Sequence, residues 1–216
     1  MSQDNLSVAV IDYGASNLRS VVKALEKAGC PSPLVTSDPQ EVLNAQAVVF
    51  PGQGASDPAM KALRGRGLDV AIMEVIARGR PYLGICLGLQ LLLDSSEEGQ
   101  EPCLGVVPGR VRRLPGGVKV PHMGWNQVAL RERHPLFQGV PSHSNFYFVH
   151  SYYAVPDDPA LVLGTTDYDV TFCSVLAKGN LVAAQFHPEK SGPMGLKLYD
   201  NFVRLMVLQE AAQPWR

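Results

Sequence analysis

The sequence lacks the features that mark a secreted or membrane-spanning protein. Its 216 residues include only four cysteines, and none form a C-x-x-C pair, so neither a disulfide framework nor a zinc site is expected. There is no run of about 20 uncharged apolar residues, which argues against a membrane-spanning helix. The N-terminal segment MSQDNLSVAVIDYG lacks the basic stretch and long apolar core of a signal peptide. We therefore expect a reduced, cytoplasmic protein with no membrane contact and no bound metal.

Charge is neither abundant nor one-sided. The chain carries 19 Lys and Arg against 20 Asp and Glu, for a net charge of -1, and only 18% of its residues are charged. This balance predicts no basic face of the kind that nucleic-acid binding requires. With 46% hydrophobic residues the chain is neither disordered nor fibrous. Its length predicts a single domain over residues 1–216, with a core of about residues 7–207.

The first half alternates between strand-like and helix-like segments. Short β-branched runs are each followed by a segment with apolar residues at helical spacing, such as Leu18, Val21 and Leu25. This alternation is typical of an α/β fold with a central, mostly parallel sheet flanked by helices. The predicted strands are 6–12, 32–36, 47–50 and 82–85, and the predicted helices are 17–28, 39–44, 68–78 and 87–94.

The second half contains short strand-like runs separated by proline and glycine turns. Since no long helix intervenes between them, we expect a mixed or antiparallel extension of the same sheet. A closing helix is predicted over 193–209. The predicted strands are 105–107, 127–130, 145–149, 152–155, 170–176 and 181–186.

The segment Gly84–Gly88 has the form of a nucleophile elbow, G-x-S-x-G, with Cys86 in place of serine. It lies where a predicted strand meets a predicted helix, so the turn would project the thiol at the carboxyl end of the sheet. The N–H groups and dipole of the helix that follows would favour a thiolate there. The alternative is a buried structural cysteine, which is a common fate of this residue.

A thiol nucleophile needs a base, and His187 is the histidine that closes an apolar strand. Pro188 favours an extended backbone at His187, so Glu189 would share its face and orient the imidazole. The alternative is a surface His-Pro-Glu turn with an incidental charge. Two other histidines, His122 and His150, stay open as binding residues. The remaining two, His134 and His143, are expected to be solvated turn residues.

The glycine-rich segment Pro51–Gly54 follows a predicted strand, and its backbone N–H groups could face outward. One interpretation is an oxyanion hole, completed by the N–H of Leu87. The other is an ordinary Gly/Pro loop. A phosphate-binding loop is not indicated, because no G-x-x-x-x-G-K-[ST] motif is present.

In their order along the chain, Pro51–Gly54, Gly84–Gly88 with Gln90, and Phe186–Glu189 resemble the motifs of the class I, triad-type glutamine amidotransferases. The resemblance runs from residue 8 to about residue 205. Three further segments resemble, within that class, the family of glutaminase subunits of imidazole glycerol phosphate synthases: the opening IDYG-x-x-NL at residues 11–18, PHMGWN at 121–126, and HPEKS at 187–191.

The resemblance implies a flavodoxin-like amidotransferase fold and hydrolysis of glutamine to glutamate and ammonia without a cofactor. Cys86 would attack the side-chain amide, His187 would transfer the proton, and Glu189 would hold the imidazole ring. The motif positions implied for glutamine binding are Gln90, Glu98, Ser151 and Tyr152, and those implied for the oxyanion hole are the backbones of Gln53, Gly54 and Leu87.

The resemblance also implies a heterodimer with a (β/α)8-barrel cyclase, which uses the ammonia to form imidazole glycerol phosphate and an aminoimidazole carboxamide ribotide in histidine biosynthesis. We expect Trp125 to anchor the partner, because it lies in a polar, glycine-containing segment read as a loop and Trp is enriched at interface hot spots. The alternative for Trp125 is a place in the core. The expected interface residues are Pro121, His122, Met123, Trp125, Asn126 and Lys190.

Two other functions remain to be weighed. A catalytically silent, regulatory relative has no chemical need for the Cys-His-Glu set that this sequence retains. A glutaminase of another branch, such as that of a pyridoxal phosphate synthase, is disfavoured by the segment Pro121–Asn126. Co-purification with a (β/α)8 cyclase, or its gene nearby, would separate these alternatives.

Overall fold

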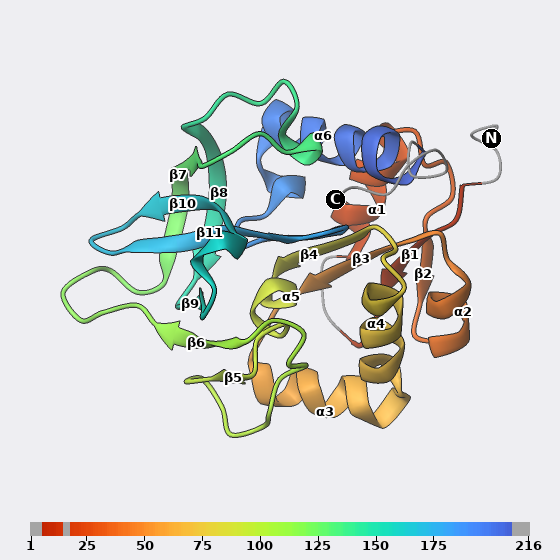
Figure 1. Cartoon of the computed structure of the whole chain (residues 1–216), viewed down its shortest axis with the longest axis horizontal. Coiled ribbons are helices and arrows are strands. Elements are labelled where there is room, and N and C mark those ends of the chain that lie inside the picture. The colour runs from red at the N-terminus through yellow and green to blue at the C-terminus, as the bar shows by residue number, and fades with distance from the viewer. Residues whose placement is uncertain (1–5, 15–17, 209–216) are drawn as a thin grey trace.

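The computed structural model describes residues 6–14 and 18–208, whose strands form one twelve-stranded sheet. The predicted ends of two helices, Asn17 and Gln209, lie outside the described residues. Five neighbouring strands pair in parallel and make the centre of the fold (Figure 1). In sheet order they are β2 (Leu34–Thr36), β1 (Val8–Ile11), β3 (Ala47–Gly52), β4 (Tyr82–Cys86) and β12 (Leu181–Ala184).

Four of these strands, β1, β3, β4 and β12, are buried on both faces, as their near-continuous apolar sequences predict, whereas the edge strand β2 is partly exposed. Helices cover each face and enclose two separate hydrophobic clusters. Figure 1 shows α1 (Leu18–Lys27) and α6 (Gly192–Asn201) together on one side of the sheet. On the opposite side lie α2 (Pro39–Asn44), α3 (Ser56–Arg66), α4 (Leu68–Ala77) and the single turn α5 (Leu87–Gln90).

Beyond β12 the sheet continues in antiparallel order, which confirms the predicted extension. One path runs through β11 (Thr171–Lys178), β10 (Val162–Asp167), β7 (His122–Leu130) and β8 (Ser144–His150). A second path leaves β11 through β9 (Tyr152–Pro156), β6 (Gly109–Arg113) and β5 (Ser95–Ser96). Short 3-10 turns occupy Pro135–Phe137, Pro159–Leu161 and Pro188–Lys190.

Two predicted elements are wrong for a shared reason. The predicted strand 105–107 is a loop, and the predicted helix 87–94 ends at Gln90. The N–H groups of Leu104–Val107 donate instead to the carbonyl groups of Leu91–Leu93. The N–H groups of the later segment therefore satisfy the carbonyl groups that follow α5, and the helix following Cys86 has one turn only.

Three further predictions need correction. Helix α3 was not expected, because Pro58 and Gly65 interrupt its apolar pattern. Strand β10 was also missed; it contains Gly164, and glycine is rare in strands. The segment expected to be a loop at Pro121–Asn126 instead enters β7, which begins at His122 and pairs with β8 from His122 to Val128. The closing helix is confirmed as α6, which passes into a π-helix over Phe202–Val207.

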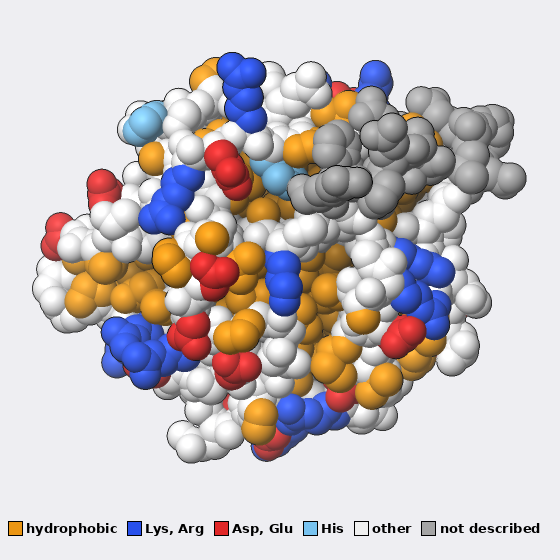
Figure 2. Space-filling model, viewed as in Figure 1, with side chains coloured by type: hydrophobic (Ala, Val, Ile, Leu, Met, Phe, Trp, Pro, Cys, Tyr) orange, Lys and Arg blue, Asp and Glu red, His pale blue; other side chains and the backbone are white. Residues whose placement is uncertain are grey.

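The surface in Figure 2 intersperses basic and acidic side chains over the face shown. Among the described residues no helix is long and apolar enough to cross a membrane. Nor do the described His, Cys, Asp and Glu residues gather in threes as a metal site would require.

Candidate active site

Cys86 lies at the sharp turn between β4 and α5, as the elbow motif predicts. Its backbone has φ 56° and ψ -109°, an unusual conformation for a residue with a side chain. Such a conformation costs on the order of 1–3 kcal/mol and persists only where the surrounding structure enforces it. The turn lifts the thiol out of the sheet, as a nucleophile elbow requires.

Three glycines let the elbow pack closely against its neighbours. A Cβ on Gly88 would lie 2.1 Å from the carbonyl oxygen of Phe50, and a Cβ on Gly84 would lie 2.9 Å from the carbonyl oxygen of Gly88. A Cβ on Gly52, opposite Cys86 in the β3–β4 register, would lie 2.5 Å from the Gly88 nitrogen. The segment after β3 is therefore held directly beside the thiol.

His187 and Glu189 complete a buried set with Cys86. Nδ1 of His187 lies 2.8 Å from Oε1 of Glu189, and both side chains are almost completely buried. Burial opposes a charged imidazole at His187. The opposing charge of Cys86, together with hydrogen bonds and charge from Glu189, outweighs burial and raises the pKa of His187 above its ordinary value. This arrangement favours a charged imidazolium at His187, beside the Cys86 sulfur.

A cavity of about 390 Å³ opens onto the thiol. Its volume falls within the usual range for small-molecule sites. Eleven of the residues singled out from the sequence line it: Gln53, Gly54, Cys86, Leu87, Gln90, Glu98, Pro121, Ser151, Tyr152, His187 and Lys190. His150, which the sequence left open as a binding residue, lines it as well, and so does Val149. The five other singled-out residues, Glu189, His122, Met123, Trp125 and Asn126, lie outside the lining.

Glu98 reaches the cavity from the loop after β5. Its Oε2 atom accepts a hydrogen bond from the Ser56 N–H at 2.8 Å, which ties it to the start of α3. The Asp57 carboxylate holds the adjoining loop by accepting from the N–H groups of Gln100 and Glu101. Burial raises the pKa of Glu98, the Ser56 contact opposing that shift. Glu98 thus brings a fixed acidic group to one side of the cavity.

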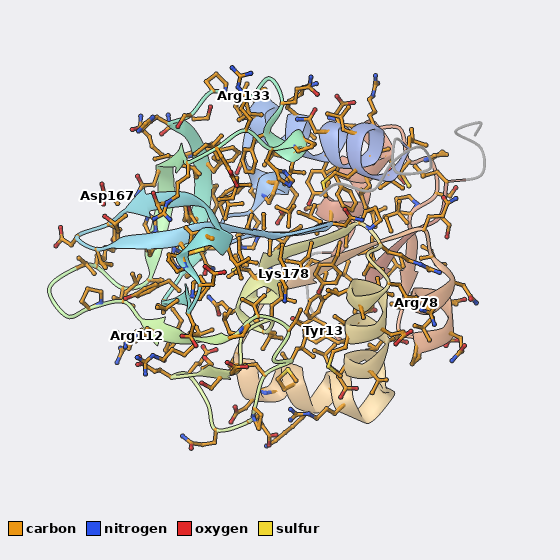
Figure 3. All side chains as sticks on the ribbon, in the orientation of Figure 1. Tyr13, Arg78, Arg112, Arg133, Asp167 and Lys178 are labelled. Carbon is orange, nitrogen blue, oxygen red and sulfur yellow. The ribbon has the colours of Figure 1, made fainter. Side chains whose placement is uncertain are left out.

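The peptide group at Gln53 does not present its N–H to the cavity. That N–H donates to the Tyr13 hydroxyl at 3.1 Å, and the hydroxyl lies 3.3 Å from the Gln53 carbonyl oxygen. Tyr13, which is labelled in Figure 3, packs edge-on against Phe50 on the side of the sheet that carries α3 and α4. Burial raises the pKa of Tyr13 to about 12, so its hydroxyl stays neutral.

A polar chain links β7 to the cavity wall. The Asn126 amide contacts His122 at 3.3 Å, and Nδ1 of His122 lies 3.0 Å from Nε2 of His150. Nδ1 of His150 in turn donates to the Tyr152 carbonyl at 2.9 Å. Burial lowers the pKa of His122 to about 4 and that of His150 to about 3. Both rings are therefore neutral near pH 7, and His122 supports the cavity from behind.

Strand geometry separates the residues of the segment 121–126. Alternate side chains of β7 face opposite sides, so His122 is buried whereas Met123 and Trp125 are 61% and 59% exposed. The alternative of a core position for Trp125 is therefore wrong. Trp125 lies edge-on against Tyr147 of β8, and the pair gives this side of the sheet an aromatic surface.

Two residues of this region were not predicted from the sequence. Gln185 is completely buried and its amide lies 3.6 Å from the Cys86 sulfur. Tyr13 contacts the peptide at Gln53. A signal existed for Gln185, because it is polar within an apolar strand and lies two residues before His187. No local signal distinguishes Tyr13, whose partner is 40 positions away along the chain.

The sequence profile of the class-I glutamine amidotransferase family matches residues 9–206. Imidazole glycerol phosphate synthase subunit HisH of Dehalococcoides mccartyi (strain CBDB1) is 54% identical over 199 residues, which are 92% of this chain and 97% of the relative. The same-named subunit of Synechococcus sp. (strain JA-2-3B'a(2-13)) is 53% identical over 203 residues, covering 92% and 93%. A solved glutamine amidotransferase superposes with a TM-score of 0.72 at 19% identity, covering 92% of this chain and 98% of its own, a likeness of fold alone.

Proposed function

This chain belongs to the class-I glutamine amidotransferase family, and from that premise we propose that it is the glutaminase subunit of an imidazole glycerol phosphate synthase. The observation that carries the proposal is the buried set of Cys86, His187 and Glu189 beside a cavity of about 390 Å³. The proposed reaction converts glutamine to glutamate and ammonia. The direct test is glutamate release from glutamine by the purified subunit together with its cyclase.

In the proposed mechanism the Cys86 thiolate attacks the carbon of the glutamine side-chain amide. The protonated His187 gives its proton to the departing nitrogen, so ammonia leaves and a thioester forms on Cys86. Water then attacks the thioester, with His187 accepting its proton, so that the carbon–sulfur bond breaks, glutamate is released and the Cys86 thiolate is regenerated. Glu189 holds the Nδ1 side of the ring, so the other nitrogen is turned toward the reacting atoms.

We assign glutamine recognition to the walls of the cavity. The Glu98 carboxylate suits the substrate's α-ammonium group, and Ser151 and Tyr152 border the same cavity. Gln90 positions the residues of the cavity wall, because its amide nitrogen donates to the Tyr152 carbonyl at 2.8 Å and to Gln185. The N–H of Leu87 is the proposed first donor to the oxyanion, and the backbone at Gln53 and Gly54 the second.

The resting state of the isolated subunit is then poorly active. The Gln53 N–H already donates to the Tyr13 hydroxyl, so it is engaged before an oxyanion develops. Removing one oxyanion donor costs about 10²–10³ in rate, so release of this N–H is sufficient for control. Gly54, with φ +90° and no atom within 4 Å of an added Cβ, lies next to this peptide and gives it conformational freedom. If binding of the liganded cyclase released the Gln53 N–H from Tyr13, ammonia would be produced only when the cyclase can use it.

We expect Tyr13→Phe to raise glutamine hydrolysis by the isolated subunit about 10-fold or more, with little change in KM. The substitution removes the hydroxyl that accepts the Gln53 N–H and keeps the ring against Phe50. The measurement is steady-state glutamate release without cyclase. Tyr82→Phe is the matched control, because that hydroxyl is also buried near Phe50 but has no hydrogen-bond partner among the described residues. An unchanged or lower rate for Tyr13→Phe would refute the proposed role of Tyr13.

Gly52→Ala would not test the same idea. The added Cβ would collide with the backbone of the elbow at Gly88 and disturb Cys86 itself. Loss of activity in that variant would report steric damage to the elbow, whereas Tyr13→Phe leaves the elbow's contacts in place.

We propose that the exposed face of β7 binds the (β/α)8-barrel cyclase. Met123 and Trp125 project from this face, and Pro121 and Lys190 lie where the cavity lining approaches it. His122 and Asn126 support the strand from its inner side and contact each other. Large exposed apolar side chains grouped on one face are typical of a protein–protein interaction surface.

We expect Trp125→Ala to weaken cyclase binding about 10-fold or more and to change the melting temperature little. Truncating an aromatic anchor commonly accounts for a large share of interface free energy, and Trp125 is 59% exposed in the free chain. The measurements are titration calorimetry with the cyclase and thermal melting. Val70→Ala is the control, because Val70 is a similarly exposed apolar side chain, 62% exposed, but lies on α4 and not on β7. A large stability loss with unchanged binding would contradict the assignment.

A further inference from the structure

Gln185 stands out as a polar side chain buried in the sheet directly beside the nucleophile. It follows β12, is 0% exposed, and belongs to none of the roles assigned above. Its Nε2 atom lies 3.6 Å from the Cys86 sulfur, and its Oε1 atom lies 3.1 Å from Nε2 of Gln90. The backbone N–H of Gln185 donates to the Ser174 carbonyl, which fixes the residue in the sheet.

The direction of these hydrogen bonds is set by a backbone carbonyl. The Tyr152 oxygen can only accept, so the Gln90 atom 2.8 Å from it must be the amide nitrogen. That nitrogen has a second hydrogen, which it gives to Gln185, and the receiving atom there must be the oxygen. The amino group of Gln185 is left facing Cys86. The contact at the sulfur is therefore a donor contact.

The sulfur has need of such a donor. A thiolate in a buried site requires compensation for lost solvation. The helix after Cys86 is a single turn, Leu87–Gln90, and offers only a small dipole. The Val149 carbonyl, 3.9 Å from the sulfur, is an acceptor and cannot stabilise a negative charge. Apart from His187, Gln185 is the side chain that the hydrogen-bond geometry places as a donor to this atom.

We propose that Gln185 is a further catalytic residue, which donates an N–H to the Cys86 thiolate and raises the fraction of the enzyme that is ready to attack. This role rests on the proposed glutaminase function for its purpose. Hydrogen bonds to charged groups are stronger than neutral ones, and the bond weakens once the sulfur becomes a neutral thioester. Gln90 acts as a positioning residue, because it holds the Gln185 amide in the donating orientation.

The test is the pH dependence of Cys86 alkylation by iodoacetamide, followed by mass spectrometry of the Cys86 peptide. Gln185→Met keeps the length of the side chain but removes the donor. We expect alkylation near pH 7 to fall about 10-fold and the midpoint of the profile to move up by about one pH unit. Gln185→Glu keeps an oxygen for Gln90 but turns a second oxygen toward the sulfur, and we expect a larger shift in the same direction.

Ser174→Ala is the control for disturbance of the sheet, since Ser174 is a buried neighbour on β11 whose backbone contact to Gln185 is retained. It should leave the profile unchanged. If Gln185→Met fails to fold, the alkylation profile of Gln185→Glu, which retains the Gln90 contact, tests the proposal instead. A folded variant of either kind with the wild-type profile overturns the proposal.

Alkylation needs no glutamine turnover, so this result is separate from the proposed function. A shifted profile in a protein that releases no glutamate would support the contact and refute the glutaminase assignment. An unshifted profile in an active glutaminase would refute the role of Gln185 and support the glutaminase assignment. In an active enzyme we also expect Gln185→Met to lower kcat about 10-fold with little change in KM, which a loss of substrate binding would not produce.

Discussion

Cys86→Ala is expected to abolish glutamine hydrolysis, with a loss of about 10⁴-fold or more. The variant retains the backbone of the elbow but lacks the atom that forms the thioester. Glutamate release by the complex with cyclase, with and without the cyclase's nucleotide ligand, measures the effect. Since the hydrogen bonds of the Cys86 sulfur with Gln185 and Val149 are long, 3.6 Å and 3.9 Å, folding and partner binding should be retained.

The other three thiols are poor candidates for the nucleophile. Burial raises the pKa of Cys103 to about 11, that of Cys173 to about 12 and that of Cys30 above its ordinary value. Each therefore stays protonated at neutral pH, when only the thiolate is reactive. A glutamine-like electrophile should label Cys86 alone, and Cys103→Ala should behave as wild type. Labelling at Cys103 would overturn the assignment of the nucleophile.

His187→Asn is expected to be nearly as damaging as loss of Cys86, and Glu189→Gln less so. Residues that act as a unit show non-additive effects, and the orienting carboxylate commonly contributes less than the nucleophile or base. In Glu189→Gln the hydrogen bond to Nδ1 of His187 can persist, but the charge that favours the imidazolium is lost. The measurement is kcat for glutamine in the complex, with the double variant His187→Asn/Cys86→Ala as the test of non-additivity.

His150→Asn is the control for His187, because His150 is the other histidine that lines the cavity. Both of its ring nitrogens are already engaged, Nδ1 with the Tyr152 carbonyl and Nε2 with His122. It should retain activity, with KM affected more than kcat. An inactive His150→Asn together with an active His187→Asn would show that the base is misassigned. Synthesis from added ammonium salts should survive either change, because under the proposed function the triad only supplies ammonia.

Sequence patterns were sufficient where one local feature determines the structure. The elbow could be predicted because glycine at both flanks of Cys86 permits the close approaches that the fold requires at Gly84 and Gly88. The pairing of His187 with Glu189 was expected from an extended backbone, and His187 itself is extended as Pro188 favours. Glu189 however lies in the 3-10 turn Pro188–Lys190, so this turn, and not alternation along a strand, brings the two side chains to 2.8 Å. The parallel core followed from continuous apolar runs such as 47–50.

Patterns failed where the structure depends on contacts far along the chain. The segment at 121–126 reads as a loop from its proline, glycine and polar residues, yet pairing with β8 makes it a strand. Helix α5 is shortened because Leu104–Val107 take the carbonyl groups that would have continued it. The donor role of Gln185 depends on Gln90, 95 positions away, and no local spacing reveals such a partner.

The central claim is that Cys86 releases ammonia from glutamine for a partner cyclase, and transfer of the amide nitrogen tests it most directly. The complex is supplied with glutamine labelled with ¹⁵N in its side-chain amide, and imidazole glycerol phosphate is analysed by mass spectrometry. We predict that the product carries the label with the wild-type subunit and not with Cys86→Ala, while labelled ammonium ion serves both. Unlabelled product from the wild type, or labelled product from Cys86→Ala supplied with glutamine, would contradict the account.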